Sequence, residues 1–495
     1  DMVSRGLGDV YKRQSKDSQS AISGATSFSK RPCRHHSGVN TLTASTRIGD
    51  GVVTPAFARF RLMSTSVVEV NLDGLVGPSH HYAGLAFGNE ASLKHRAMPS
   101  SPRHAAIQGL EKAWQVARMG IPQAVLPPQN RPRLDWLAEL GFVGPPSVVL
   151  SRVSQEAPQL LSAAYSASPM WCANAGTVSP STDTSDRKVH VTPANLNHGL
   201  HRSLESEETL KLFRAIFPSS HFEIHLPLPI GRNLQDEGAA NHTRLAPTQS
   251  KPGIHLFVYG VDSLSPEHAA PEKFPPRQTR LASEAIIRRH GLDPAHCVLA
   301  QQHPDTIDAG VFHHDVIGVG HEDFMLIHGN ALMHQDAVLE ELQKKYTKVH
   351  GSKLELVILE PHELSLTDAV SSYLFNSQIL TEASGRRTMI CPSESESNPA
   401  AARCLNRLVE SSSRVESVRF LNLRESMNNG GGPACLRLRA PLSRGERNAV
   451  HSGVWLTESR YNTLRSIIES MYREQITFED LKNCLLYTSD AADEV

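Results

Sequence analysis

The chain has 495 residues, enough to bury a large core, and its 50 lysines and arginines are balanced by 51 aspartates and glutamates. This balance gives no reason to expect nucleic acid or an anionic membrane as a partner, and no stretch approaches the roughly 18 apolar residues of a membrane helix. Seven scattered cysteines without a C-x-x-C pair argue against a disulfide framework or a structural zinc site, so we expect a soluble protein of the reducing cytoplasm that binds a small molecule.

Residues 1–62 are expected to be a disordered or non-native leader. They contain ten basic residues, four acidic residues and nine serines, with no glutamate and no apolar periodicity. A mitochondrial presequence has a similar composition, whereas the opening DMVSRGLGDVYKRQ and the closing CLLYTSDAADEV resemble translated adapter sequence. We therefore predict a single catalytic domain over 63–483, cut short at its C-terminus, and a non-native tail over 484–495.

Short apolar runs alternate with amphipathic helices between these limits, which is typical of an α/β protein. Helix signals predict helices over 101–120, 279–290 and 335–346. Strands are expected at 255–259, 310–319, 354–359 and 436–442, and the alternation of leucine and arginine in the last one indicates one solvated face. No internal repeat is visible by eye.

The first candidate functional segment is 73–92, whose glycines and polar residues are typical of a lid or ligand-binding loop. His201, Arg202 and Arg277 supply further cationic or polar groups. The planar fork of an arginine suits a carboxylate, although most arginines are simply solvated.

Adjacent carboxylates mark the segment 235–242, where Asp236 and Glu237 precede small residues that cannot cover them. Two neighbouring acids are usually part of a solvated turn. The glycine and alanines that follow indicate instead a confined place, where a carboxylate holds a cation or transfers a proton.

Two histidines and an acid occur in the segment 310–315. On a strand, His313 and Asp315 would point to one face and His314 to the other. A metal site that adds His80 and His81 competes with this interpretation. Adjacent histidines on a strand chelate poorly and no H-E-x-x-H motif occurs, so we predict no metal.

The most unusual segment is 426–435, in which three glycines and a proline lead into Cys435 at the start of a strand. Glycines allow close backbone approach and positive φ, so Cys435 is a candidate nucleophile. The alternatives are a small buried cysteine without a chemical role or a phosphate-binding loop, but no G-K-[ST] sequence follows.

Taken in order, these segments resemble the succinylarginine dihydrolase family of the guanidino-group-modifying (pentein) superfamily. The likeness runs from about Val68 to Lys482 and includes LVGPSHHYAGLAFGNEAS, SASPMWCANAGTVSPS, DEGAANH, LFVYG, PPRQTRLASEA, GVFHHDVI, SYLFNSQ and ESMNNGGGPACLRLR. The resemblance implies a five-bladed pseudo-symmetric α/β propeller of ββαβ modules, and therefore one domain rather than the three that length alone suggests.

The resemblance also implies roles for individual residues. Cys435 matches the nucleophile, His313 the general acid-base, and Glu237 the carboxylate that assists it. Asp315 matches a residue that holds the guanidinium. Other substrate contacts are implied for Ala83, Gly84, Leu85, Ala86, Phe87, Gly88, Asn89, Glu90, Ala91, Ser92, Asn174, His201, Arg202, Arg277 and Asn429. No cofactor and no metal are expected.

The implied reaction is the hydrolysis of N2-succinyl-L-arginine to N2-succinyl-L-ornithine, two ammonia and carbon dioxide, a step of arginine catabolism. A guanidinium is a stable cation with a pKa near 13 and resists attack by water. A thiolate attacks more strongly, and the substrate's own cation would lower the pKa of a cysteine from about 8.5. Arg202 and Arg277 would lie near the succinyl and α-carboxylates.

Three other functions stay open at this point: a deiminase that releases one ammonia, a metal-dependent amidohydrolase using His80, His81 and His313, and a non-catalytic propeller that binds acylated amino acids. Ala86 and His314 depart from the hydroxyl residue and the asparagine that are typical of the family. The expected partner is a small-molecule substrate, with a homodimer as an open alternative to a monomer.

Overall fold

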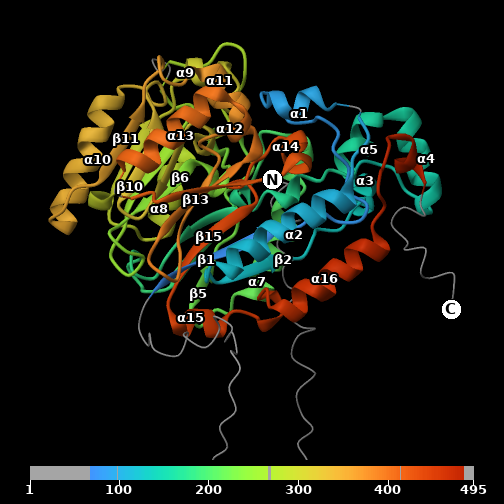
Figure 1. Ribbon diagram of the computed structural model, residues 1–495. Coiled ribbons are helices and arrows are strands. Elements are labelled where there is room, and N and C mark those ends of the chain that lie inside the picture. The colour runs from blue at the N-terminus through green and yellow to red at the C-terminus, as the bar shows by residue number, and fades with distance from the viewer. Residues whose placement is uncertain (1–66, 97, 266–268, 413, 484–495) are drawn as a thin grey trace, which may run out of the picture. The chain divides into compact units, whose positions relative to one another are not determined.

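A computed structural model describes residues 67–96, 98–265, 269–412 and 414–483 (Figure 1). All of them belong to the unit Ala56–Val495. The predicted leader over 1–62 and tail over 484–495 lie outside the described residues and stay predictions.

The described residues form five three-stranded sheets that share one pattern. In each sheet an inner strand pairs antiparallel with the middle strand, and the middle strand pairs parallel with the outer strand. In the order inner, middle, outer, the sheets are β15 (Arg437–Leu442), β1 (Val68–Gly74), β2 (Gln123–Leu126); β3 (Gly176–Ser179), β4 (Val189–Pro193), β5 (Phe222–Ile224); β6 (His242–Leu245), β7 (Ile254–Tyr259), β8 (Cys297–Gln301); β9 (Gly318–His321), β10 (Phe324–His328), β11 (Glu355–Leu359); and β12 (Gln378–Thr381), β13 (Arg387–Pro392), β14 (Ser417–Leu421).

A helix connects the two parallel strands of each sheet, as a parallel connection requires. These crossover helices are α2 (Pro102–Arg118), α7 (Ser206–Ile216), α8 (Arg280–Arg289), α10 (Gln335–His350) and α13 (Pro399–Ser411). The remaining helices are α1 (Glu90–Lys94), α3 (Leu134–Glu139), α4 (Pro146–Glu156), α5 (Pro158–Ala164), α6 (Leu200–Ser203), α9 (Pro304–Asp308), α11 (Leu366–Ser372), α12 (Ser393–Ser397), α14 (Arg424–Asn429), α15 (Arg444–Ala449) and α16 (Glu458–Met471). The chain is therefore built from five ββαβ modules.

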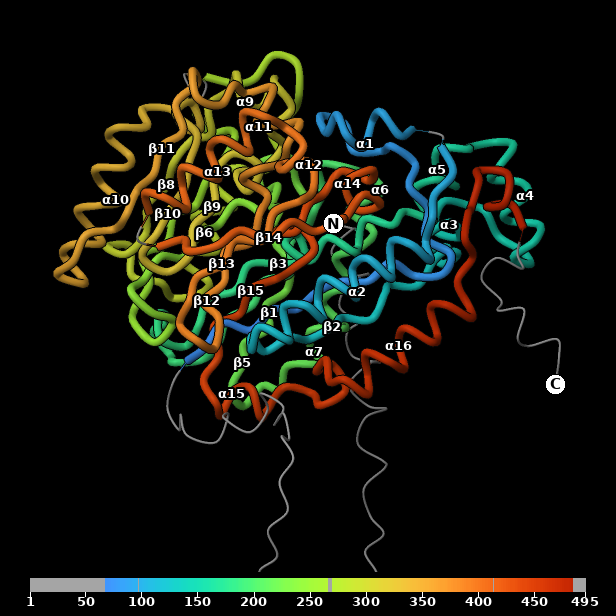
Figure 2. Tube along the Cα trace, viewed as in Figure 1, coloured from blue at the N-terminus to red at the C-terminus, as the bar shows by residue number. Residues whose placement is uncertain are grey.

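The last strand closes the ring by pairing with the first. β15 runs antiparallel to β1, in register from Val68 opposite Leu442 to Asp73 opposite Arg437. Figure 2 shows this red strand beside the blue one, although more than 360 residues separate them in sequence. One module is thus assembled from both ends of the chain, and α16 packs against α2 beside it.

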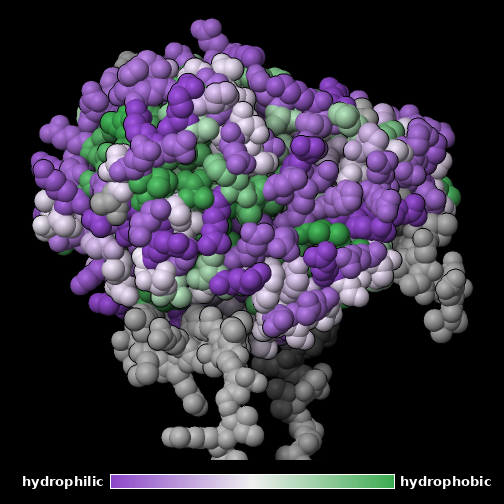
Figure 3. All heavy atoms as spheres, viewed as in Figure 1, coloured by the Kyte–Doolittle hydropathy of each residue, from purple (hydrophilic) through white to green (hydrophobic). Residues whose placement is uncertain are grey.

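Local sequence explains the crossover helix α13. The Asn398 side chain accepts hydrogen bonds from the backbone N–H groups of residues 400 and 401, and Pro399 occupies the first helical position. Leu405 and Leu408 of this helix join Leu342 of α10 in the largest apolar core. Figure 3 shows a largely hydrophilic face with apolar side chains visible around α10 and α13, where β11 is only half buried.

The predicted helices are confirmed and one predicted strand is wrong. Helix 101–120 corresponds to α2, helix 279–290 to α8, and helix 335–346 to α10, which continues to His350 because Gly351 supplies the left-handed turn that ends it. The segment 310–319 is not one strand: a 3-10 turn, η7 (His314–Val316), precedes the short β9. Within the described ranges no helix is both long and apolar enough to cross a membrane.

Candidate active site

A polar residue precedes the inner strand of every module. Asn174 lies before β3, Glu237 before β6, His313 and Asp315 before β9, Asn376 before β12, and Cys435 before β15. The inner strands lie against one another, since β15 contacts β3 and β9 contacts both β6 and β12. The five segments therefore meet at one end of the ring of inner strands.

Hydrogen bonds connect these five segments into a closed circle. Asn174 Nδ2 donates to the carbonyl of Glu237 at 2.7 Å, and the His314 N–H donates to Asn241 Oδ1 at 3.0 Å; these bonds join the segments before β3, β6 and β9. Asn376 Nδ2 donates to the carbonyl of Asp315 at 3.3 Å, which joins the segments before β9 and β12. The Ala434 N–H donates to the carbonyl of Asn376 and the Ala173 N–H to the carbonyl of Cys435, both at 3.1 Å, and these two bonds join the segment before β15 to those before β12 and β3. Each module thereby positions its neighbour's site residue.

Cys435 is buried, and its sulfur has two polar neighbours. Its thiol donates to Oδ2 of Asp315 at 3.6 Å and accepts from Nδ2 of Asn376 at 3.2 Å. The preceding glycines are required because a Cβ on Gly431 would lie 2.5 Å from Nε1 of Trp171, and one on Gly432 would lie 2.7 Å from Oδ1 of Asn376. The glycines thus let the segment that carries Cys435 pack directly against Trp171 and Asn376.

Burial favours the neutral forms of both Cys435 and Asp315. It raises the pKa of the Cys435 thiol well above its ordinary value, and the carboxyl of Asp315 adds to this rise. Burial also raises the pKa of Asp315 to about 7, against the opposing hydrogen bonds of Cys435 and Asn376. A cation bound beside them would oppose both effects, because it favours the thiolate and the carboxylate.

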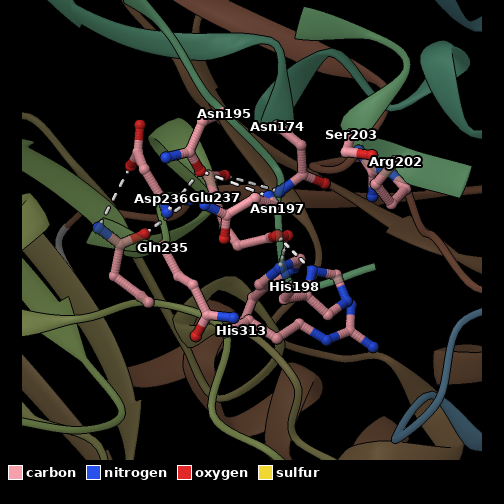
Figure 4. Close-up of polar contacts among 12 residues, drawn as sticks. Asn174, Asn195, Asn197, His198, Arg202, Ser203, Gln235, Asp236, Glu237 and His313 are labelled. Carbon is pink, nitrogen blue, oxygen red and sulfur yellow. Dashed lines mark hydrogen bonds and ion pairs between the residues drawn. The ribbon is translucent and has the colours of Figure 1, made fainter. Parts of the chain in front are cut away.

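Glu237 lies between two imidazoles (Figure 4). Its Oε2 is 2.8 Å from Nε2 of His313 and its Oε1 is 2.6 Å from Nδ1 of His198. Burial alone would raise the pKa of Glu237, but the two histidines outweigh it and hold that pKa well below its usual value. Glu237 is therefore a carboxylate that accepts a ring N–H from each histidine.

His313 is poised to accept a proton. Burial lowers its pKa to about 4, although Glu237 opposes the shift. Since Nε2–H is directed at Glu237, Nδ1 is the basic nitrogen, and it has no hydrogen-bond partner among the described residues. This is the tautomer that a general base needs, with the carboxylate stabilising the imidazolium that forms.

Arg277 joins the predicted loop to the site. Its Nη2 donates to the carbonyl of Phe87 at 2.7 Å, and its guanidinium lies over the Phe312 ring, 4.9 Å from the centroid. The side chain is buried, which lowers its pKa to about 10, and within the described part of the chain no carboxylate forms an ion pair with it. Arg277 is thus a buried cation that is available to an anionic ligand.

Arg202 differs from Arg277, because two nitrogens of its guanidinium already have a carboxylate partner. Its Nε and Nη2 donate to the two carboxylate oxygens of Glu205 at 2.8 and 3.3 Å, and it lies 5.4 Å from the Trp171 ring. A substrate carboxylate would have to share this arginine with Glu205.

A small cleft unites several of the predicted loop residues. It is lined by Ala83, Leu85, Ala86, Ser92, Ser166, Ser168, Trp171, His201 and Asn429. Gly84 and Gly88 adopt positive φ values of 64 and 83 degrees in this loop, and Asn89 fixes it by donating to the carbonyl of Gly430 at 2.8 Å. The loop and the nucleophile segment are therefore tied to each other.

Other predicted residues are not brought to this cleft. Glu90 pairs with Lys94 at 3.8 Å on the exposed side of α1, and Ala91 packs in an apolar cluster. The alternative metal site is not assembled either: His80 Nε2 contacts the carbonyl of Gln129 at 2.8 Å, and no three His, Cys, Asp or Glu side chains are arranged to hold a metal within the described ranges.

Sequence reasoning missed two residues of the site. Asn376 was noted only as part of the motif SYLFNSQ, and the signal that identifies it is its place before an inner strand, as in the other four modules. His198 carried no signal, since its contact with Glu237 joins segments 39 residues apart.

Five ββαβ modules arranged around a ring of inner strands, with a polar site where those strands begin, define an α/β propeller of the pentein type. The family model described as "AstB: Succinylarginine dihydrolase" matches residues 66–495. The chain therefore belongs to the succinylarginine dihydrolase family.

Two sequence relatives agree with this assignment. The N-succinylarginine dihydrolase of Acinetobacter baumannii strain ACICU is 46% identical over 430 residues, covering 86% of this chain and 96% of the relative. That of Burkholderia ambifaria strain ATCC BAA-244 is 47% identical over 416 residues, covering 83% and 92%. Among solved structures, the cyanobacterial arginine dihydrolase ArgZ superimposes with a TM-score of 0.46 at 17% identity, over 79% of this chain and 42% of ArgZ.

Proposed function

We propose that this protein hydrolyses N2-succinyl-L-arginine with two waters to N2-succinyl-L-ornithine, two ammonia and carbon dioxide. The observation that carries the proposal is the position of the Cys435 sulfur, 3.6 Å from Asp315 in the buried site that also holds the His313–Glu237 pair. Relatives at 46–47% identity that are named N-succinylarginine dihydrolase support this choice of substrate.

The first round removes one ammonia. Asp315 holds the guanidinium, His313 takes the proton of the Cys435 thiol, and the sulfur attacks the guanidinium carbon. The imidazolium then gives this proton to a departing nitrogen, so that ammonia leaves and a thiouronium remains on Cys435. A water transfers a proton to His313 and attacks the same carbon, the carbon–sulfur bond breaks, and a ureido compound is formed.

The second round repeats these steps on the ureido carbon. The sulfur attacks, the second ammonia leaves, and a thiocarbamate remains on Cys435. Water then releases a carbamate, which loses carbon dioxide to give the free amine of N2-succinyl-L-ornithine. Proton transfer of this kind contributes about 10²- to 10⁴-fold to a rate, and Glu237 supports it by stabilising protonated His313.

The other end of the substrate carries the succinyl and α-carboxylates. Arg277 is the cation best suited to bind one of them, because it is buried and its hydrogen bond goes only to the carbonyl of Phe87 among the described residues. Free arginine lacks the succinyl carboxylate and would bind less well. We further infer a cytoplasmic enzyme; a homodimer and the lack of nucleic-acid binding stay predictions.

The test counts ammonia and examines the thiol. Purified protein should release two ammonia for each N-succinylarginine consumed, whereas one ammonia with a citrulline-type product would identify a deiminase. Cys435→Ala should abolish turnover and still bind substrate in a calorimetric titration. The matched control Cys404→Ala changes a buried thiol of α13 and should keep its activity; retained turnover in Cys435→Ala would exclude covalent catalysis.

A further inference from the structure

A second cavity lies inside the ring of inner strands. Every module contributes to its wall, with Val178 from β3, Thr243 from β6, Val319 from β9, Ser377 before β12 and Arg439 from β15. Its volume is about 70 Å³, enough for a few water-sized molecules, and it shares no lining residue with the small cleft beneath the loop 83–92. We call this cavity the axial chamber.

The axial chamber reaches the reacting centre through Asp315. This residue and Ala434, the neighbour of Cys435, line its inner end. Oδ2 of Asp315 is in contact with the Cys435 sulfur, while Oδ1 is buried without a hydrogen-bond partner among the described residues. A molecule released beside this carboxylate therefore lies at the chamber's inner end.

The opposite end opens at the protein surface. Ala434 and His314 are buried, whereas Arg244, Gln249 and Arg439 of the chamber wall are partly exposed, as is Asp315 itself. Gln249 lies on the turn between β6 and β7, outside the ring of site residues. Apart from Asp315, which borders both the chamber and the Cys435 sulfur, the exposure of the lining thus rises from the site toward this turn.

Polar groups along the wall require water. Both ring nitrogens of His314, Nε of Arg437 and Oε1 of Glu69 are buried and have no partner among the described residues. Because buried polar groups in folded proteins are hydrogen-bonded, ordered water is expected to satisfy them. A water-filled chamber can also carry ammonia, which is of similar size and forms the same kinds of hydrogen bond.

In the proposed two-round reaction, ammonia must leave the site while the ureido intermediate stays bound, and such a chamber makes this possible. Each round consumes one water and releases one ammonia, and the ureido intermediate must stay bound between rounds. If ammonia could leave only when the loop over the cleft opens, the intermediate would be free to leave at the same moment. A separate route for small molecules removes this conflict.

We propose that the axial chamber is a rear passage that carries ammonia out and water in between the two rounds, while the loop 83–92 retains the ureido intermediate. The inference rests on the proposed function. Asp315 forms the inner end of the passage, since it contacts the Cys435 sulfur and lines the chamber. Gln249 marks the outer mouth.

Two substitutions obstruct the passage at different depths. Gln249→Trp fills the mouth and Ala239→Leu narrows the interior, where Ala239 is partly exposed to the chamber. Gln249→Ala and Ala239→Ser are the matched controls. With N-succinylarginine as substrate, the fraction of product released as N-succinylcitrulline should rise roughly tenfold in both obstructed variants. Ammonia must then leave by opening of the loop 83–92, and the ureido intermediate can leave at the same time. Mass spectrometry measures this fraction.

N-succinylcitrulline supplied as the substrate provides the internal comparison. It needs one round only, so its products leave when the loop opens at the end, and the obstructed variants should convert it at the rate of their controls. An unchanged product ratio in the variants, or an equal loss of both reactions, would overturn the passage. If the interior variant fails to fold, the mouth variant decides. Release of a single ammonia by the unmodified protein would instead contradict the proposed function.

Discussion

The side-chain nitrogen of Asn376 donates to the sulfur of Cys435 at 3.2 Å, while the side-chain oxygen accepts from the backbone N–H of the same cysteine at 3.3 Å. The oxygen also accepts from the N–H of Gly432 at 3.0 Å. One amide thus holds both the nucleophilic atom and the loop that carries it. Since these bonds exist without substrate, the sulfur is oriented before binding.

Replacing this amide by an acid separates its two roles. In Asn376→Asp an oxygen still accepts from the loop N–H groups, but the donor to the sulfur is lost and a carboxylate faces the thiolate. A hydrogen bond to a charged group contributes about 1.5–3 kcal/mol, so kcat should fall about 10- to 100-fold with little change in KM. Steady-state kinetics and the pH dependence of iodoacetamide alkylation measure the change, and alkylation should require a higher pH.

Asn398→Asp is the control for that experiment. It makes the same change at the start of α13, where an acid can also accept the N–H bonds of the first turn. It likewise removes an amide donor, here the one to Oδ1 of Asp368 at 2.9 Å, far from the sulfur. Equal kcat values in the two variants would show that Asn376 has no special relation to the sulfur.

The raised pKa of Asp315 predicts the acid side of the activity profile. Burial raises this pKa to about 7, and a guanidinium binds the ionised form. Below pH 7 the carboxyl is protonated before binding, so kcat/KM should fall by about tenfold for each pH unit and level off above pH 7.

Measurement of kcat/KM from pH 5 to 9 tests this profile, and Asp315→Asn should remove the acid limb. Burial also raises the pKa of Asp236, to about 6. Asp236→Asn is therefore the matched variant, and it should keep the limb near pH 7. A profile that stays flat down to pH 5 would exclude Asp315 as the guanidinium ligand.

His198 is a positioning residue that acts through Glu237. Its Nδ1 lies 2.6 Å from the carboxylate that also binds His313. His198→Ala removes one donor, so the full charge of Glu237 acts on His313 and should raise the pKa of that imidazole above its value of about 4. Without His198, the Glu237 carboxylate is held less firmly against His313, and kcat should fall about tenfold.

The readouts for His198 are the titration of the His313 ring by NMR and the kinetic constants. His198→Asn keeps an N–H donor and should recover part of the rate. If the alanine and asparagine variants lose activity equally while the titration of His313 stays unchanged, His198 only fills space.

The sequence identified most residues of this site but not the reason they meet. The proposed catalytic residues came from a family resemblance, and the long amphipathic helices from capping residues and periodicity. The five-module repeat escaped detection because its common features are strand order and hydrogen bonding, while the connecting segments differ in length and composition. Asn376 was missed for the same reason, since its role is visible only after the modules are aligned.

Two errors have physical causes. The run 310–319 contains apolar residues that favour a strand, but residues His314–Val316 form a 3-10 turn. The His314 N–H at its start bonds Oδ1 of Asn241 at 3.0 Å, and a tertiary contact of this kind has no sequence period. The alternating arginines of 436–442 were expected to face solvent. Arg437 is buried and Arg439 only partly exposed, because both line the axial chamber inside the ring of inner strands.

Arg277 offers the sharpest test of substrate choice. Arg277→Met keeps an unbranched stem and removes the charge, so a substrate carboxylate would be left without its partner. Losing one member of a buried charge pair costs about 2–5 kcal/mol, and KM for N-succinylarginine should rise about 30-fold or more with a smaller change in kcat. The bond to the Phe87 carbonyl is lost as well, so backbone amides near residue 87 should exchange hydrogen faster.

Arg280→Met, at a partly exposed arginine paired with Glu284 at 3.0 Å, is the matched control and should leave both readouts unchanged. An unaltered KM in Arg277→Met would mean that the succinyl and α-carboxylates bind elsewhere, for example at Arg202, another buried cation near the cleft.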